Sequence, residues 1–177
     1  MKLIKLTALP LLFIVFVLGI TSCEKNAEKK KTTDYEKKNI PLTGAQETPA
    51  NPSSALGSMD VFYSKETRIL SYTVRWSGLT DSVMLMHIHG LAPTGFAAGV
   101  VQNIIITATN GSPGNGIFAQ KTTAGRFNFA KSGTITASLL ADGVFVKEQD
   151  ILNGSFYMNI HTATYPSGEI RGQITFQ

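Results

Sequence analysis

All three histidines of the chain lie in two short stretches of similar sequence. Residues 86–89 read Met-His-Ile-His, and residues 158–161 read Met-Asn-Ile-His. Side chains alternate between the two faces of an extended strand, so His87 and His89 share one face of the first stretch. If the two stretches are neighbouring strands of one sheet, His161 joins them and three imidazoles converge.

Three imidazoles at one point are typical of a metal site. Neutral imidazole is a good ligand for copper and zinc, and a His-x-His pair on one strand face presents two nitrogens together. In this hypothesis His87, His89 and His161 supply three protein ligands and leave one position open. The chain would then be a copper- or zinc-binding protein or a redox protein.

The main interpretation of the same histidines is structural, with no bound cofactor expected. Histidines on the polar face of a covered strand can hydrogen-bond backbone carbonyls or polar side chains and so fix a loop over the sheet. The other candidate members of such a network, or of a ligand-binding surface, are Glu47, Tyr157, Asn159, Glu169 and Arg171.

The sequence offers no convincing nucleophile, so no catalytic residue is assigned and a non-enzymatic protein is expected. It contains no Gly-x-Ser-x-Gly motif, and its one cysteine is expected to carry lipid. Acid–base chemistry by Glu169 with His161 is left as an open alternative.

Short β-rich runs separated by turn residues must position these side chains. Residues 58–63 and 70–76 alternate apolar and polar types around a turn at 65–67, which predicts a β-hairpin. The pattern predicts an all-β domain, either an antiparallel two-sheet sandwich or a flattened barrel. Further predicted elements are the histidine strands from residue 83 and around 156–161, strands at 100–109, 117–121, 126–129, 134–139 and 169–176, a turn at 110–114 and a helical turn at 147–152.

The N-terminus predicts export and anchoring. Residues 1–22 have the basic start and apolar middle of a signal peptide, and Ile-Thr-Ser-Cys at 20–23 resembles the bacterial lipobox, in which Cys23 is lipidated. Each buried acyl methylene contributes about 0.8 kcal/mol, so two or more chains anchor durably. Residues 23–39 are rich in charge and poor in apolar side chains, which predicts a disordered tether.

The net charge of the chain, +4, belongs to these N-terminal parts. The signal and the tether each contribute +2, whereas residues 40–177 hold eight basic and eight acidic side chains. Nucleic-acid binding needs a concentrated basic surface, so a nucleic-acid partner is not expected.

Three blocks of the folded part carry a family resemblance. They read Leu-Thr-Gly-Ala-Gln-Glu-Thr-Pro at 42–49, His-Ile-His-Gly at 87–90, and Pro-Ser-Gly-Glu-Ile-Arg-Gly-Gln at 166–173. Together they resemble a CHRD domain, named from chordin, over essentially all of 40–177. The resemblance implies an extracellular all-β module with no established catalytic activity.

These observations together predict a non-enzymatic bacterial lipoprotein of the cell envelope. The lipid on Cys23 would hold it in the outer membrane, facing the periplasm or the surface. Its CHRD domain would bind an unknown protein or surface ligand. The metal-binding or redox hypothesis is the alternative, and it depends on whether the three imidazoles meet.

Overall fold

The computed structural model describes residues 34–106 and 131–176. This part of the chain contains eight strands, one 3-10 turn and one short α-helix. In chain order they are β1 Tyr35–Thr43, η1 Gly44–Gln46, β2 Leu56–Ser64, β3 Ile69–Ser77, β4 Leu85–Gly90, β5 Val100–Ile106, β6 Gly133–Leu140, α2 Glu148–Leu152, β7 Phe156–His161 and β8 Ile170–Gln173.

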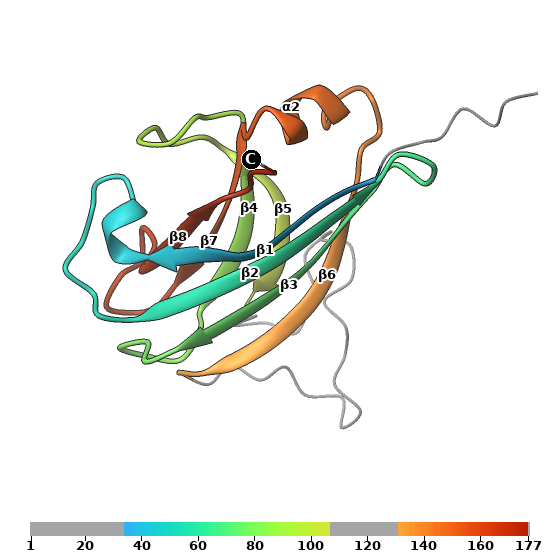
Figure 1. Cartoon of the computed structure of the whole chain (residues 1–177). Helices are drawn as coiled ribbons and strands as arrows, with labels where there is room; N and C mark the ends of the chain where they lie inside the picture. The colour runs from blue at the N-terminus through green and yellow to red at the C-terminus, as the bar shows by residue number, and fades with distance from the viewer. Residues whose placement is uncertain (1–33, 107–130, 177) are drawn as a thin grey trace, which may run out of the picture. The chain divides into compact units, whose positions relative to one another are not determined.

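The strands form one antiparallel sheet in the order β5-β4-β7-β8-β1-β2-β3-β6. This sheet curls until its two edge strands, β5 and β6, approach each other, and α2 lies at one end of the resulting barrel (Figure 1). The all-β prediction is confirmed. Of the two predicted forms, the sandwich and the flattened barrel, the structure has the barrel, and this barrel is nearly closed (Figure 1).

The predicted hairpin is present as β2 and β3, and the alternation of apolar and polar residues along it decides which side chains face the interior of the barrel. The two strands pair from Leu56 with Ser77 to Ser64 with Ile69. Most of their apolar positions are buried, although Leu56 and Phe62 are exposed and Ile69 is half-buried, and their polar positions are half-buried or exposed. Burial of such side chains is the main favourable term in folding. The buried members of the hairpin are Met59, Val61, Tyr63, Leu70, Tyr72, Val74 and Trp76.

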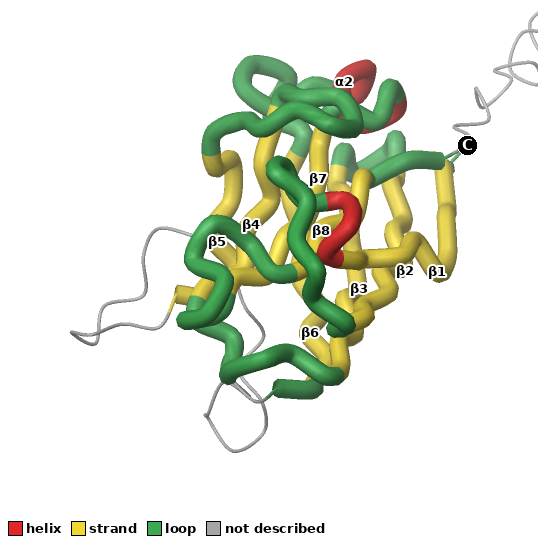
Figure 2. Tube along the Cα trace, turned by 90° about the vertical axis from the view of Figure 1, so that its left-hand side faces the viewer, coloured by secondary structure: helices red, strands yellow, loops and turns green. Residues whose placement is uncertain are grey.

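Strand β7 differs from the hairpin because all six of its residues are buried. Phe156, Met158 and Ile160 belong to the apolar core inside the barrel. The opposite face of the strand carries polar side chains, and loop segments run across the outer side of this part of the sheet (Figure 2). The strand is therefore packed between the core and a polar layer beneath loops.

Strand β1 corrects the expected boundary of the tether. It begins at Tyr35, so residues 35–39 are strand, although their charge predicts disorder. Tyr35, Glu36 and Lys37 pair with residues of β2, and the Tyr35 ring packs edge-on against Phe176. Pairing with an existing strand gives these residues hydrogen bonds that their own low hydrophobicity does not predict.

Other predicted elements agree with small differences in length. The helical turn is α2, and β4 begins at Leu85, two residues later than expected. The last strand ends at Gln173, and the close approach predicted at Gly172 is confirmed, because a Cβ there would lie 2.7 Å from the Pro41 carbonyl oxygen. The predictions at 110–114, 117–121 and 126–129 lie outside the described residues.

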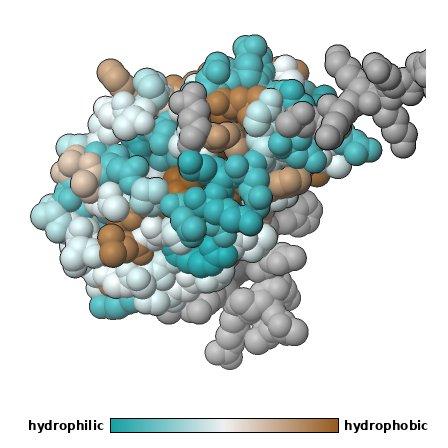
Figure 3. Space-filling view, in the orientation of Figure 1, coloured by the Kyte–Doolittle hydropathy of each residue, from teal (hydrophilic) through white to brown (hydrophobic). Residues whose placement is uncertain are grey.

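No helix in the described part of the chain is long and apolar enough to span a membrane. The face seen in Figure 3 is mostly hydrophilic or neutral, with hydrophobic residues in small separate patches. The described residues therefore form no broad apolar surface on that face (Figure 3).

Candidate functional site

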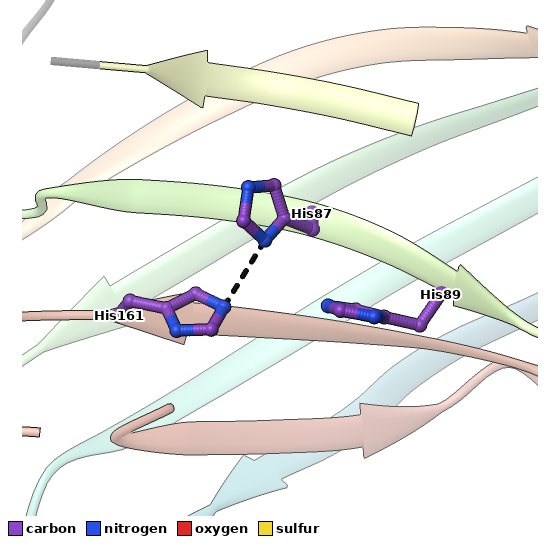
Figure 4. Close-up of side chains that lie close together, drawn as sticks. All are labelled: His87, His89 and His161. Atoms are coloured by element: carbon purple, nitrogen blue, oxygen red, sulfur yellow. Dashed lines mark hydrogen bonds between the residues drawn. The ribbon is translucent and has the colours of Figure 1, made fainter. Parts of the chain in front are cut away.

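The pairing of β4 with β7 brings the two histidine stretches side by side. His87 lies directly opposite Asn159, while His89 lies opposite Tyr157 and His161 opposite Leu85. One nitrogen from each of the three histidines lies within 4.8 Å of the others. Figure 4 shows the rings turned toward one another, two from β4 and one from β7. The three imidazoles therefore converge.

Loops cover the histidines and fix the orientation of two rings. His87, His89 and His161 are only 7%, 8% and 6% exposed. The Nδ1 atom of His89 lies 2.9 Å from the carbonyl oxygen of Ala98, and Nδ1 of His161 lies 2.9 Å from that of Pro166. A carbonyl only accepts hydrogen bonds, so each Nδ1 carries the proton and each neutral ring keeps a lone pair on Nε2.

These two lone pairs meet one side-chain oxygen. Asn159 Oδ1 lies 3.0 Å from Nε2 of His89 and 2.9 Å from Nε2 of His161. His87 Nδ1 lies 3.1 Å from the same His161 nitrogen and can donate a proton to it. With these assignments Nε2 of His89, Nε2 of His161 and Oδ1 of Asn159 are all hydrogen-bond acceptors that face one another, and His87 alone supplies a proton to them. A bound cation would balance this surplus of acceptors, and so would an inverted Asn159 amide that turns its nitrogen toward the rings.

Burial keeps the three rings uncharged. It lowers the pKa of each histidine, and that of His87 falls to about 4, with the neighbouring His161 and His89 adding to the decrease. The rings are therefore neutral at pH 7. Neutral imidazole is the form that binds a metal ion.

A stack of three side chains holds the ring of His89. Tyr157 lies parallel to it, with ring centroids 4.8 Å apart, and the Arg171 guanidinium lies 3.5 Å from the Tyr157 centroid on a cation–π contact. Arg171 also donates hydrogen bonds to the Thr48 hydroxyl and the Phe96 carbonyl. The stack therefore ties the sheet to two covering segments.

Glu47 is brought to the cluster by the opening motif, which folds back against the sheet. Its carboxylate accepts hydrogen bonds from the Asn159 side chain and the Thr48 backbone. Among the described residues, its Oε1 is the buried side-chain atom without a hydrogen-bond partner. Burial raises the pKa of Glu47 to about 7, and the positive charge of Arg171 only partly opposes this.

Replacement of Glu47 by Gln is expected to stabilise the protein above pH 7. The raised pKa means that the folded state binds the proton more tightly than the unfolded state, whose pKa is near 4.5, so the contribution of Glu47 to stability falls as pH rises from about 4.5 to 7. The neutral amide does not titrate. The variant should gain on the order of 2 to 3 kcal/mol over wild type by pH 7.5 and show little difference at pH 4.

Urea unfolding at a series of pH values measures this difference. Glu66→Gln, in an exposed turn, is the matched control and should show no such pH-dependent gain. A Glu47→Gln variant with the same pH profile as wild type would contradict the expected protonation of Glu47.

Glu169 lies in a separate group of contacts and not beside a histidine. Its two carboxylate oxygens accept hydrogen bonds from the hydroxyls of Ser53, Thr80 and Thr162 and from the Thr80 backbone amide. The pairing of Glu169 with His161 that acid–base chemistry would need is therefore not seen, and that open alternative loses its geometric basis. The three hydroxyl partners were missed because all three lie in loops, where strand periodicity does not place side chains.

Comparison with known proteins gives one family. A family model described as CHRD domain matches residues 39–174, which contain every residue of the cluster. No curated protein and no solved structure matches the chain.

Proposed function

Because the chain belongs to the CHRD domain family, we propose that its barrel is a non-enzymatic, extracytoplasmic module that binds one copper or zinc ion through His87, His89 and His161. The observation that carries this proposal is the convergence of the three rings. It is supported by the carbonyls that hold the Nδ1 atoms of two rings, since metal-binding histidines almost always donate their second N–H to such a partner.

The same proposal places the module on a membrane. The signal at 1–22 and the lipobox ending at Cys23 support a bacterial lipoprotein held in the outer membrane, facing the periplasm or the surface. The balanced charge of residues 40–177 gives no support for a nucleic-acid partner.

Metal content tests the proposal. The full chain, purified in detergent without a histidine tag and incubated with copper or zinc, should retain one ion per chain after desalting. His87→Ala should weaken binding at least about 100-fold, because two ligands remain of three. Glu66→Ala removes an exposed carboxylate and is the control that should leave binding unchanged. Substoichiometric metal in the wild type, or binding unaffected by His87→Ala, would refute the metal site.

A second candidate is an anchored module whose ligand is a protein or another surface molecule, with the histidines as a structural network. It is favoured by the hydrogen-bond contacts that all three rings already make to carbonyls, to Asn159 or to one another. With an inverted Asn159 amide these contacts need no ion. This candidate predicts a protein that binds neither copper nor zinc stoichiometrically and whose stability falls when a histidine is removed.

A further inference from the structure

We infer that the side-chain oxygen of Asn159 is a fourth ligand, which completes a donor set of three nitrogens and one oxygen and makes the site selective for Cu(II). The inference rests on the proposed metal-binding function and names the metal and the coordination. It is carried by the position of Asn159, by the contacts of its oxygen, and by the residue that orients its amide.

Asn159 occupies the centre of the cluster. It is paired with His87 across the two strands and shares a strand face with His161, two residues further along β7. It is buried, and its Oδ1 is in contact with the Nε2 atoms of both His89 and His161. It also stands in the second stretch where His87 stands in the first. The repeated pattern thus places a donor atom at each of the four positions.

Three contacts link the four donors in a chain from His87 to His89. Their separations are 3.1 Å from His87 to His161, 2.9 Å from His161 to Asn159, and 3.0 Å from Asn159 to His89. Neighbouring ligands at right angles, each about 2.0 to 2.1 Å from one ion, lie about 2.9 Å apart, whereas tetrahedral neighbours lie about 3.4 Å apart. The three contacts match the separation of neighbours at right angles, but the histidine nitrogens spread over as much as 4.8 Å, and two ligands on opposite sides of one ion lie at most about 4.2 Å apart. The donors must therefore draw together around an ion. Three nitrogens and one oxygen in a tetragonal arrangement are typical of Cu(II).

Glu47 acts as a positioning residue for this ligand. Its carboxylate accepts a hydrogen bond from the Asn159 amide nitrogen, which leaves Oδ1 directed at the histidines. Gly168 allows the contact, because its φ is +126° and a Cβ there would collide with Glu47 Oε1. A side chain at Gly168 would therefore disturb the orientation of Asn159.

The test uses Cu(II) and Zn(II) titrations of the full chain and of two variants. Asn159→Leu has similar volume but no donor, and it should lower the affinity for Cu(II) at least about tenfold. Asn159→Asp keeps an oxygen donor but loses the amide N–H that Glu47 accepts, so it should bind Cu(II) more tightly than Asn159→Leu. The affinity for Zn(II), which binds well with three histidines and a water, should change less in Asn159→Leu.

Electron paramagnetic resonance of copper-loaded wild type provides a measurement that does not depend on how the variants fold. If Asn159 fills the equatorial oxygen position, no water binds there. The copper spectrum recorded in H₂¹⁷O should then show no broadening from an equatorial oxygen-17. Broadening from an equatorial water, or equal Cu(II) affinity in a folded Asn159→Leu variant, would overturn the fourth ligand while the three-histidine site stands. Wild-type protein that binds no metal would instead overturn the proposed function.

Discussion

Replacement of Glu169 by alanine is expected to lower the free energy of unfolding by about 3 to 4 kcal/mol. The carboxylate has no exposed surface and accepts four hydrogen bonds, from Ser53, Thr162 and two atoms of Thr80. Hydrogen bonds to a charged group are stronger than neutral ones, and their removal leaves buried donors unpaired. The loss should loosen the segments that precede β2 and β4, because both are tied to this single side chain.

Urea unfolding followed by the fluorescence of Trp76, the only tryptophan of the chain, measures the effect. Glu169→Gln keeps an acceptor and should be intermediate, and Glu66→Ala, in the exposed turn after β2, should stay within about 0.5 kcal/mol of wild type. If Glu169→Ala is as stable as the Glu66 variant, Glu169 does not hold these segments.

The affinity for a bound metal ion is expected to fall far less than 10³-fold between pH 7.5 and pH 5.5. If three histidine ligands had the ordinary pKa of about 6.5, competition from protons at pH 5.5 would lower the metal affinity about tenfold for each ring, or about 10³-fold for the three together. Burial lowers the pKa of all three rings here, to about 4 for His87. His87 then contributes almost no loss at pH 5.5 and each of the other two rings less than tenfold, so the measured loss should stay below about 100-fold, with the steep decrease at lower pH.

Competition with a chelator of known protonation behaviour gives this pH profile. The unfolding free energy of metal-free protein supplies a companion measurement. A histidine whose pKa is lowered in the folded state stabilises the fold above pH 6.5, and this stability is lost as pH falls toward the folded pKa. A 10³-fold loss of metal affinity by pH 5.5 would show that the rings titrate as exposed groups do.

Much of the fold could be predicted because the strands follow simple alternation. The hairpin of β2 and β3 buries the alternating apolar residues that the sequence indicates. The same alternation placed Phe156 and Met158 on one face of β7, and the structure puts both in the core. The start of β1 could not be predicted, because its charged residues are ordered by pairing with β2 and not by their own burial.

The candidate site could be predicted in its members and not in its contacts. The three histidines, Asn159 and Tyr157 share the faces that strand periodicity assigns to them. Their meeting depends on β4 and β7 being neighbours, which requires the strand order. The partners that orient His89 and His161 are backbone carbonyls in loops, and every residue type has a backbone carbonyl, so residue identity does not mark them.

The enclosure of β7 has a consequence for how long an ion would stay in the protein. This strand has a hydrogen-bonded neighbour on each side, and β4 on one side and four strands on the other separate it from the sheet edges β5 and β6, where local opening begins. Its amides should therefore be among the slowest to exchange with deuterated solvent. Since Asn159 and His161 are attached to that slow segment, escape of an ion would depend on lifting of the covering loops and not on breathing of the barrel.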